Sequence, residues 1–321
     1  MSLGLTIFLF LVGLVLIIKG GDWFVDAAAW MAEASGMPKF LIGATIVSVA
    51  TTLPEIIVST MAAAEGSTDL AIGNAIGSVT ANIGLIMAVS LLFLPAVIQR
   101  KQFAFKGTLM VGSVVLLWAL CLDGVLTIAE SILVLALFAA YIVENVHTAK
   151  LESRSGAQET AAVDKSRKTL WKNIGLFVLG AACLVAGSRL LVNNGTELAK
   201  LLGVSERIIA VTMVAIGTSL PELVTAITAI VKKQTSMSVG NILGANIIDV
   251  AVILPLCSFI GGKLTIAAES MRQTLYLDIP VCALETLLAV VPTLIFKKFQ
   301  KWQGALMLCV YLAYLVLTVQ A

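Results

Sequence analysis

The chain has 321 residues, of which 59% are hydrophobic and only 12% are charged, and its formal net charge is +2. Soluble domains have about 45–50% apolar and about 25% charged residues, so this composition excludes a water-soluble enzyme and a disordered chain. The near-neutral charge without a basic tail indicates no nucleic-acid partner, and five scattered cysteines with a single histidine predict neither a disulfide scaffold nor a zinc or copper site.

Ten apolar runs follow one another along the chain, in two groups of five. A membrane-spanning helix needs about 20 apolar residues, and the runs are near this length. The first run lacks a basic start and a cleavage site, so we expect a retained helix rather than a signal peptide. The sequence therefore predicts an all-α polytopic membrane protein with ten transmembrane helices. The runs lie at residues 3–33, 39–64, 70–97, 107–122, 125–146, 172–201, 207–231, 237–260, 274–295 and 302–319.

A polar stretch at residues 148–171 separates the two groups and predicts a flexible linker between a first five-helix repeat, 1–147, and a second, 172–321. Loops on the linker side carry fifteen Lys and Arg residues, whereas loops on the side of the termini carry four. Positively charged loops stay in the cytoplasm. We therefore expect a cytoplasmic linker and extracytoplasmic termini, in the plasma (cell inner) membrane.

The two groups are copies of one another. A shift of 167 residues aligns 36–82 with 203–249 without a gap and gives 13 identities in 47 positions. Many of the matched residues are polar, which apolar composition alone would not produce. Because each copy has an odd number of spans, the second copy enters the membrane from the opposite side. The sequence thus predicts two inverted-topology repeats, typical of secondary transporters, with repeated motifs at 43–82 and 210–249.

Each motif places a proline and a glutamate in the middle of an apolar run, at Pro54–Glu55 and at Pro221–Glu222. Proline removes a helix hydrogen bond, and a carbonyl freed inside a bilayer must be satisfied by another group. A bound cation can do so. Since an intramembrane carboxylate is costly and functional by default, the two breaks predict a cation site.

Other oxygen-bearing side chains share the faces of these helices. In the second run these side chains recur at i, i+3, i+4 and i+7, which places them on one helical face. The seventh run repeats this face with an alanine at one position. The third and eighth runs each carry a polar stripe with four-residue spacing. Such hard oxygen ligands suit Ca²⁺ or Na⁺. The candidates are Ser48, Thr51, Thr52 and Glu55; Ala215, Thr218, Ser219 and Glu222; Asn74, Ser78 and Asn82; and Asn241 and Asp249.

Packing is the alternative explanation for the uncharged members of this set, because lone hydroxyls often bond to their own helix and small-residue stripes often serve helix contact. It applies most strongly to Asn74 and Asn241. Internal pairing or a helix end explains Asp22 and Asp26, which are one turn apart. For Glu285 the structural and functional interpretations are equally open.

The motifs TTLPE at Thr51–Glu55 and GTSLPE at Gly217–Glu222, each followed by a GNxxG element, resemble the two α-repeats of the Na⁺/Ca²⁺ exchanger family of the cation/Ca²⁺ antiporter superfamily. The resemblance implies a central Ca²⁺ site bridged by Glu55 and Glu222, surrounded by Na⁺ sites, with the first and sixth helices sliding as gates. The other implied Ca²⁺ ligands are Thr51, Thr218 and the backbone carbonyls of Ser48 and Ala215; the Na⁺ ligands are Thr52, Ser78, Asn82, Ser219 and Asp249; and the structural or gating residues are Pro54, Pro221, Asn74 and Asn241.

Three positions depart from the family pattern. The family repeats usually read GTS before LPE, where the first repeat here has Ala50-Thr51-Thr52. The usual GSN becomes Gly77-Ser78-Val79 in one half and Gly244-Ala245-Asn246 in the other. Ala245 removes a hydroxyl expected at one Na⁺ site, so the coupling ion and the stoichiometry stay open.

The function predicted from the sequence is secondary active antiport, in which Na⁺ is exchanged for Ca²⁺ by alternating access and Ca²⁺ is exported from the cytoplasm. No cofactor is expected, and the only partners are the lipid bilayer and inorganic cations, without an obligate protein partner. The nearest alternative is an H⁺- or K⁺-coupled exchanger, and a cation channel is less favoured because inverted repeats are typical of transporters. An intramembrane hydrolase would need a nucleophile and base or a metal site, which the sequence does not offer, so we expect no enzyme.

Overall fold

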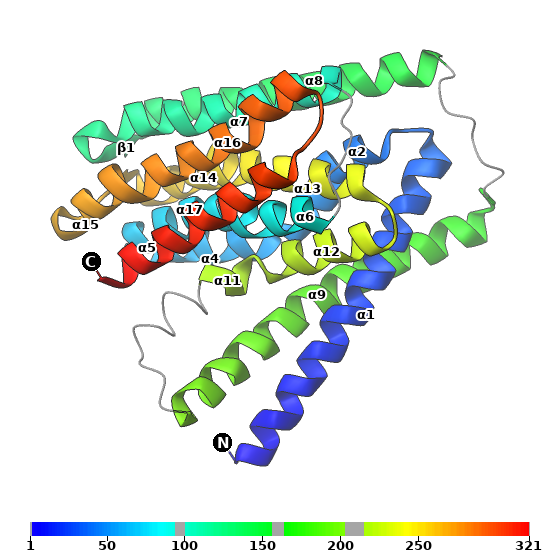
Figure 1. Cartoon of the computed structure of the whole chain (residues 1–321), viewed down its shortest axis with the longest axis horizontal. Coiled ribbons are helices and arrows are strands. Elements are labelled where there is room, and N and C mark those ends of the chain that lie inside the picture. Colours follow the sequence, from blue (N-terminus) through cyan, green and yellow to red (C-terminus); the bar gives the residue numbers. More distant parts are fainter. Residues whose placement is uncertain (1, 94–99, 156–163, 203–214, 321) are drawn as a thin grey trace.

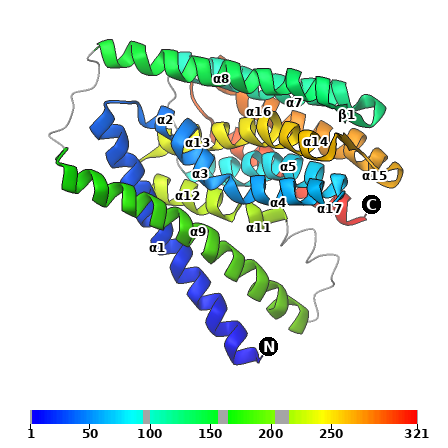
Figure 2. The ribbon, with the colours of Figure 1, turned by 180° about the vertical axis from the view of Figure 1, so that it is seen from behind.

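The computed structural model describes residues 2–93, 100–155, 164–202 and 215–320. Two long helices, α1 (Leu3–Ser35) and α9 (Arg167–Leu201), lie together along one side of the bundle at a steep angle to the other helices (Figures 1 and 2). Helix α8 (Ile128–Ser155) covers the opposite side. The short, interrupted helices that carry the two repeated motifs lie between these layers.

The remaining elements alternate between α-helix and short stretches of the wider π-helix. In the first half these are α2 Lys39–Ile42, η1 Gly43–Val47, α3 Ser48–Thr51, α4 Leu53–Ala64, α5 Thr68–Ala81, η2 Asn82–Met87, α6 Ala88–Phe93, α7 Arg100–Leu120, the 3₁₀ turn η3 Cys121–Asp123 and strand β1 Val125–Thr127. In the second half they are α11 Ala215–Thr218, α12 Leu220–Val231, α13 Thr235–Ile248, η5 Asp249–Ile253, α14 Leu254–Gly261, strand β2 Lys263–Thr265, α15 Ala268–Gln273, η6 Thr274–Asp278, α16 Ile279–Phe296 and α17 Lys301–Gln320.

The prediction of an all-helical polytopic membrane protein is confirmed. Within the described residues, eight helices are long and apolar enough to cross a membrane, and the pair 39–51 and 53–64, bent by 45° at Thr52, makes a ninth. Helix α12 is apolar but short. The predicted count of ten is therefore not reached in the described part of the chain, because the run at 207–231 is described only from residue 215 onward.

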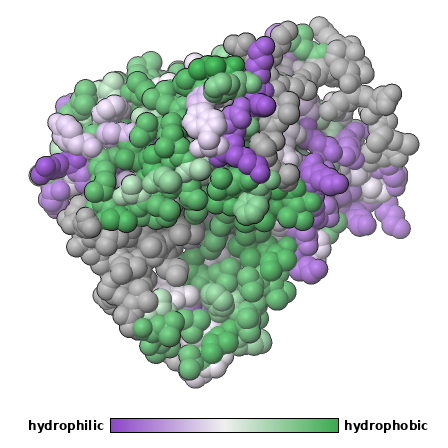
Figure 3. Space-filling model, in the orientation of Figure 1, coloured by the Kyte–Doolittle hydropathy of each residue, from purple (hydrophilic) through white to green (hydrophobic). Residues whose placement is uncertain are grey.

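The two ends of the bundle differ in what they carry. In Figure 1 the C-terminal end of α8 and the connection from α12 to α13 lie at the right, which we name the linker side. The antiparallel β1–β2 ribbon, in which Leu126 pairs with Leu264, lies at the left with the C-terminus, and we name this the terminal side. On the surface that faces the viewer in Figure 3, apolar residues cover the middle and hydrophilic residues gather toward the two ends of the bundle. This is expected for a surface in contact with lipid.

The described ends of the predicted linker are helical. Helix α8 continues to Ser155, and α9 begins at Arg167 after a cap in which the Ser166 hydroxyl accepts a hydrogen bond from the Thr169 N–H (3.3 Å). Lys, Glu, Ala, Arg and Leu in these stretches are good helix formers, so the helices extend beyond their apolar runs. Residues 156–163 lie outside the described part.

Segments related by the 167-residue shift adopt the same secondary structure. Helices α4 and α12 have matching bounds under this shift, as do α5 and α13. The π-helices η2 and η5 begin at the equivalent residues Asn82 and Asp249. The repeat seen in the sequence is thus also a repeat of local structure.

Helices α1 and α9 cross through two glycine pairs that are themselves repeat-related. A Cβ atom on Gly20 would lie 2.9 Å from the Gly180 carbonyl oxygen, and one on Gly13 would lie 3.0 Å from that of Gly187. Any larger residue would force the helices apart. The two helices therefore pack backbone against backbone, the contact that small residues permit within a membrane.

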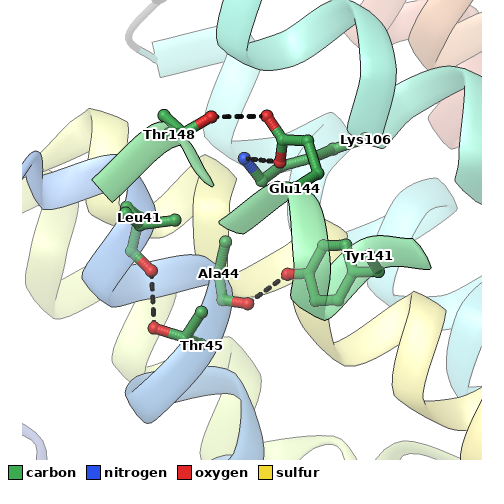
Figure 4. A network of polar contacts seen from close by, with 7 residues as sticks. All are labelled: Leu41, Ala44, Thr45, Lys106, Tyr141, Glu144 and Thr148. Carbon is green, nitrogen blue, oxygen red and sulfur yellow. Dashed lines mark hydrogen bonds and ion pairs between the residues drawn. The ribbon is translucent and has the colours of Figure 1, made fainter. Parts of the chain in front are cut away.

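A polar network holds α8 against the segment that leads into the first repeated motif (Figure 4). The Tyr141 hydroxyl donates a hydrogen bond to the Ala44 carbonyl in η1. The fully buried Lys106 ammonium on α7 is 2.8 Å from the Glu144 carboxylate on α8, which is 19% exposed, and it lies over the Phe40 ring at 5.3 Å. These contacts fix the position of α2 and η1 and thereby the approach to the helix break.

The Lys106–Glu144 ion pair makes an asymmetric stability prediction. Glu144→Gln leaves a buried ammonium without a counter-charge, so we expect a loss on the order of 3 kcal/mol in the free energy of unfolding. Lys106→Met keeps the apolar stem and leaves a carboxylate that reaches water, so we expect a smaller loss. Thermal unfolding of both variants in one detergent measures the difference, and equal stability of the two variants would contradict this account.

Candidate ion-binding site

Both repeated motifs interrupt a helix in the same way. Helix α3 ends at Thr51 and α4 begins at Leu53, with Thr52 between them at φ −81° and ψ 0°. In the second half Ser219 joins α11 to α12 with φ −84° and ψ 6°. A proline follows each junction in the first turn of the new helix, where its missing N–H is tolerated. The predicted breaks at Pro54 and Pro221 are thus present, and each turns the chain at the middle of the bundle.

The two glutamates sit in the first turns of the helices that follow the breaks. Glu55 on α4 and Glu222 on α12 are each 1% exposed. The positive end of the helix dipole favours a carboxylate at this position. Neither oxygen of Glu55 has a hydrogen-bond partner among the described residues, and Oε2 of Glu222 likewise lacks one.

Hydrogen bonds connect the two halves across the site. The Thr51 hydroxyl donates to Oδ1 of Asn241 (3.2 Å), and the Thr218 hydroxyl donates to Oδ1 of Asn74 (3.3 Å). The 167-residue shift converts the first bond into the second. Each break is therefore held by the asparagine of the opposite repeat, which supports a positioning role for Asn74 and Asn241.

One hydroxyl links the two breaks directly. The Thr52 hydroxyl lies 3.5 Å from Oε1 of Glu222, in the other half, and 2.7 Å from the carbonyl oxygen of Ser48. The Thr51 hydroxyl also lies 3.3 Å from that carbonyl, which is an alternative acceptor for its single proton. A cation bound to the Ser48 carbonyl would compete with the bond from Thr52 and would release that hydroxyl.

A second group of oxygens lies where α5 and α13 pass into the π-helices. Asp249 is completely buried, and neither of its carboxylate oxygens has a described partner. The Asn82 amide donates to Oδ1 of Asn246 (3.0 Å), while its own oxygen is left without a partner. Single π-helical turns are frequent at functional sites, and here they widen the helix next to both residues.

The described structure brings predicted residues of both repeats together around the two breaks, most of them buried, with partnerless oxygens on Ser78 and Ser219 as well as on the acids. Ala215 begins α11, and nothing is described for residues 203–214 before it. In the part of the chain that the structure describes, no three His, Cys, Asp or Glu side chains form a metal cluster. The candidate site is therefore a mixed set of carboxylate, hydroxyl, amide and carbonyl oxygens, which suits weakly held hard cations.

Two polar residues lie outside the predicted set. Asn246 contacts Asn82 and donates to the Met110 sulfur (3.5 Å); its repeat counterpart is Val79, so the repeat gave no signal for it. Glu285 on α16 is fully buried, with both oxygens unpartnered in the described structure. It lies against Gly84 of η2.

Comparison with known proteins identifies the family. The family described as sodium/calcium exchanger protein matches residues 5–146 and 172–320. The chain belongs to this family. The resemblance to this family that the sequence motifs predict is thereby confirmed over nearly the whole length of the chain.

Relatives of this exchanger extend across bacteria and archaea. It is 34% identical over 261 residues to the inner membrane protein YrbG of Escherichia coli, covering 78% of this chain and 79% of that protein. It is 28% identical to the sodium/calcium exchanger MaX1 of Methanosarcina acetivorans, covering 95% and 96%. The solved structure of the sodium-calcium exchanger NCX_Mj soaked with Na⁺ and without Ca²⁺ superposes with a TM-score of 0.83 at 29% identity, covering 98% of this chain and 99% of that one.

These matches confirm the predicted class of activity. The exchanger is an integral membrane antiporter of the Na⁺/Ca²⁺ type, not an enzyme, and its ions are substrates rather than cofactors. Its fold is that of NCX_Mj.

We expect Ca²⁺ binding to depend on the negative charges of Glu55 and Glu222. Removing one partner of a buried charge pair costs several kcal/mol, so Glu55→Gln and Glu222→Gln should each weaken Ca²⁺ binding on the order of 100-fold. Titration calorimetry of the purified variants measures this, with unfolding temperature as a check on folding. The exposed Glu269→Gln on α15 is the matched control and should bind like the unaltered protein. Near-normal affinity in both central variants would refute the site.

Proposed function

We propose that the exchanger exports Ca²⁺ from the cytoplasm in exchange for entering Na⁺, by alternating access to one site at the two helix breaks. The observation that carries the proposal is the convergence of buried, partnerless oxygens from both repeats. Glu55, Glu222 and Asp249 are three carboxylates that are each at most 1% exposed. Cations in transit are the charges that can balance them.

Glu55 and Glu222 form the centre of this site and bridge Ca²⁺, together with the Thr51 and Thr218 hydroxyls and the backbone carbonyls of Ser48 and Ala215. The Na⁺ positions lie around this centre, on the ligands Thr52, Ser78, Asn82, Ser219 and Asp249. The contact between Thr52 and Glu222 supports this division, because it joins a Na⁺ ligand to a Ca²⁺ ligand. Filling one kind of position then disturbs the other, so Na⁺ and Ca²⁺ compete.

The transmembrane plan in this proposal has ten helices in two inverted five-helix repeats. Its support is the matching bounds of α4 with α12 and of α5 with α13, and the reciprocal bonds between the two breaks. Fifteen basic residues on the linker side, against four on the terminal side, favour a cytoplasmic linker. The membrane is then the plasma (cell inner) membrane, with both termini extracytoplasmic.

Charge balance relates the site to the membrane potential. Two carboxylates neutralise one Ca²⁺ or two Na⁺, and the third, Asp249, can balance one further monovalent ion. If more than two Na⁺ exchange for one Ca²⁺, each net charge moved is worth about 2.3 kcal/mol per 100 mV. Ala245, which stands where the first repeat has Ser78, leaves one hydroxyl fewer in the second half. This asymmetry makes K⁺- or H⁺-coupled exchange the alternative to test.

Flux in proteoliposomes tests the coupling ion. An outward Na⁺ gradient should drive Ca²⁺ uptake, whereas K⁺ or pH gradients alone should drive little, because the site offers positions for Na⁺ and Ca²⁺ in competition. Vesicles with Glu55→Gln provide the control for leakage. Ca²⁺ uptake that ignores Na⁺ but follows a pH gradient would assign proton coupling instead, and currents far above carrier rates would indicate a channel.

A further inference from the structure

An ion pair joins the crossing helix α1 to the bundle on the linker side. The Lys232 ammonium, directly after α12, lies 2.7 Å from Asp26 and 3.3 Å from Asp22, and it also donates to the Asp22 carbonyl (3.1 Å). The Lys232 side chain is only 24% exposed. This explains Asp22 and Asp26 as partners of a residue more than 200 positions away, rather than of their own helix.

The backbone of α1 is closely packed on α12 beside this ion pair. A Cβ atom on Gly21 would lie 2.9 Å from Cγ1 of Val224 and 3.0 Å from the Thr228 hydroxyl. The α1–α12 interface is therefore closed, with the ion pair at its linker end.

The repeat-related interface, between α9 and α4, is open. A groove of about 840 Å³ separates the two helices, with Pro54 and Ile57 of α4 on one wall and Arg189 and Asn193 of α9 on the other. Ile57 is the counterpart of Val224 under the 167-residue shift, so the position that is packed in one half borders the groove in the other.

The same shift transfers the Asp22–Lys232 contact with its charges reversed, whereas Asp26 corresponds to the uncharged Asn193. Asp22 corresponds to Arg189, and Lys232 corresponds to Glu65 at the end of α4. Arg189 and Glu65 are both exposed and do not pair with each other in the described structure. Oppositely charged residues thus stand at these positions in both halves, but they form an ion pair in only one half of the described structure.

We infer that Asp22/Asp26–Lys232 and Arg189–Glu65 are alternative latches, the first holding the linker side closed and the second forming when the terminal side closes. The inference rests on the alternating access proposed above. Since α1 and α9 are locked together through their glycine pairs, a movement that carries α9 onto α4 carries α1 away from α12. Breaking one latch then favours the other state.

Paired reporter cysteines test this inference. Ile57→Cys reports access to the open groove, and Val224→Cys reports access to its closed counterpart. Each is labelled with a maleimide in reconstituted full-length protein and quantified by mass spectrometry of its own peptide, so that native thiols do not interfere. Lys232→Gln should raise labelling at position 224 about threefold to fivefold, the size expected for a half-exposed ion pair, and lower it at position 57. Glu65→Gln should produce the opposite change. Lys233→Gln alters the exposed residue next to Lys232, serves as the control, and should produce no change.

A charge exchange separates a latch from a general structural role. Lys232→Asp combined with Asp26→Lys should restore the labelling pattern that either single substitution disturbs. Shifts in the same direction for Lys232→Gln and Glu65→Gln, or no rescue by the exchange, would overturn the inference. Ca²⁺ titration of the same variants distinguishes a failure of this inference from a failure of the proposed function. The latch residues lie outside the site, so Ca²⁺ binding can persist even if the latches do not exist.

Discussion

The constraint on which this structure depends is that three carboxylates lie in the middle of a membrane protein with only one described hydrogen-bond partner among them, the Thr52 hydroxyl. Glu55, Glu222 and Asp249 are buried, and five of their six oxygens have no hydrogen-bond partner among the described residues. A lysine or arginine beside them would satisfy the charge permanently. Its absence from the hydrogen bonds and ion pairs described at the site leaves the charge to be balanced by ions that come and go. A protein built this way has its own stability coupled to the cations it carries.

The surrounding backbone makes this arrangement possible. Each proline turns a helix so that a glutamate stands at a helix N-terminus, where the dipole favours the negative charge. The hydroxyl of each break then bonds to the asparagine of the opposite repeat, at 3.2 Å and 3.3 Å. Each repeat thus supplies a hydrogen-bond acceptor to the break of the other repeat. The site is therefore a property of the interface between the halves, and this is a physical reason for the motif to occur twice.

How far the sequence predicts this structure depends on whether a feature is local. The breaks at Pro54 and Pro221 and the acids beside them stand out because such residues are rare in apolar helices, and the 167-residue repeat made their pairing visible. The π-helical turns at Asn82 and Asp249 could not be predicted, since a widened turn results from tertiary packing. Lys106 is one of the fifteen basic residues counted from the sequence in linker-side loops, yet it is fully buried against Glu144. Asp22 and Asp26 seemed to need only a local partner, because nothing in a linear pattern brings Lys232 to them.

A sequence repeat with an asymmetric structure has a mechanical consequence. The contact of α1 with α12 is closed, while its counterpart between α9 and α4 is a groove. The glycine pairs between α1 and α9 prevent both interfaces from closing together, because one rigid pair of helices cannot move toward both sides of the bundle. In the alternating access proposed above, exchanging the roles of the halves gives a second arrangement with similar local contacts. What selects between them must then be small: the charge balance at Glu55, Glu222 and Asp249, the Lys232 ion pair at one end, and Arg189 and Glu65, which are not paired with each other in the described structure, at the other. In this proposal, ions bound at the centre thus control the movement of helices that they do not touch.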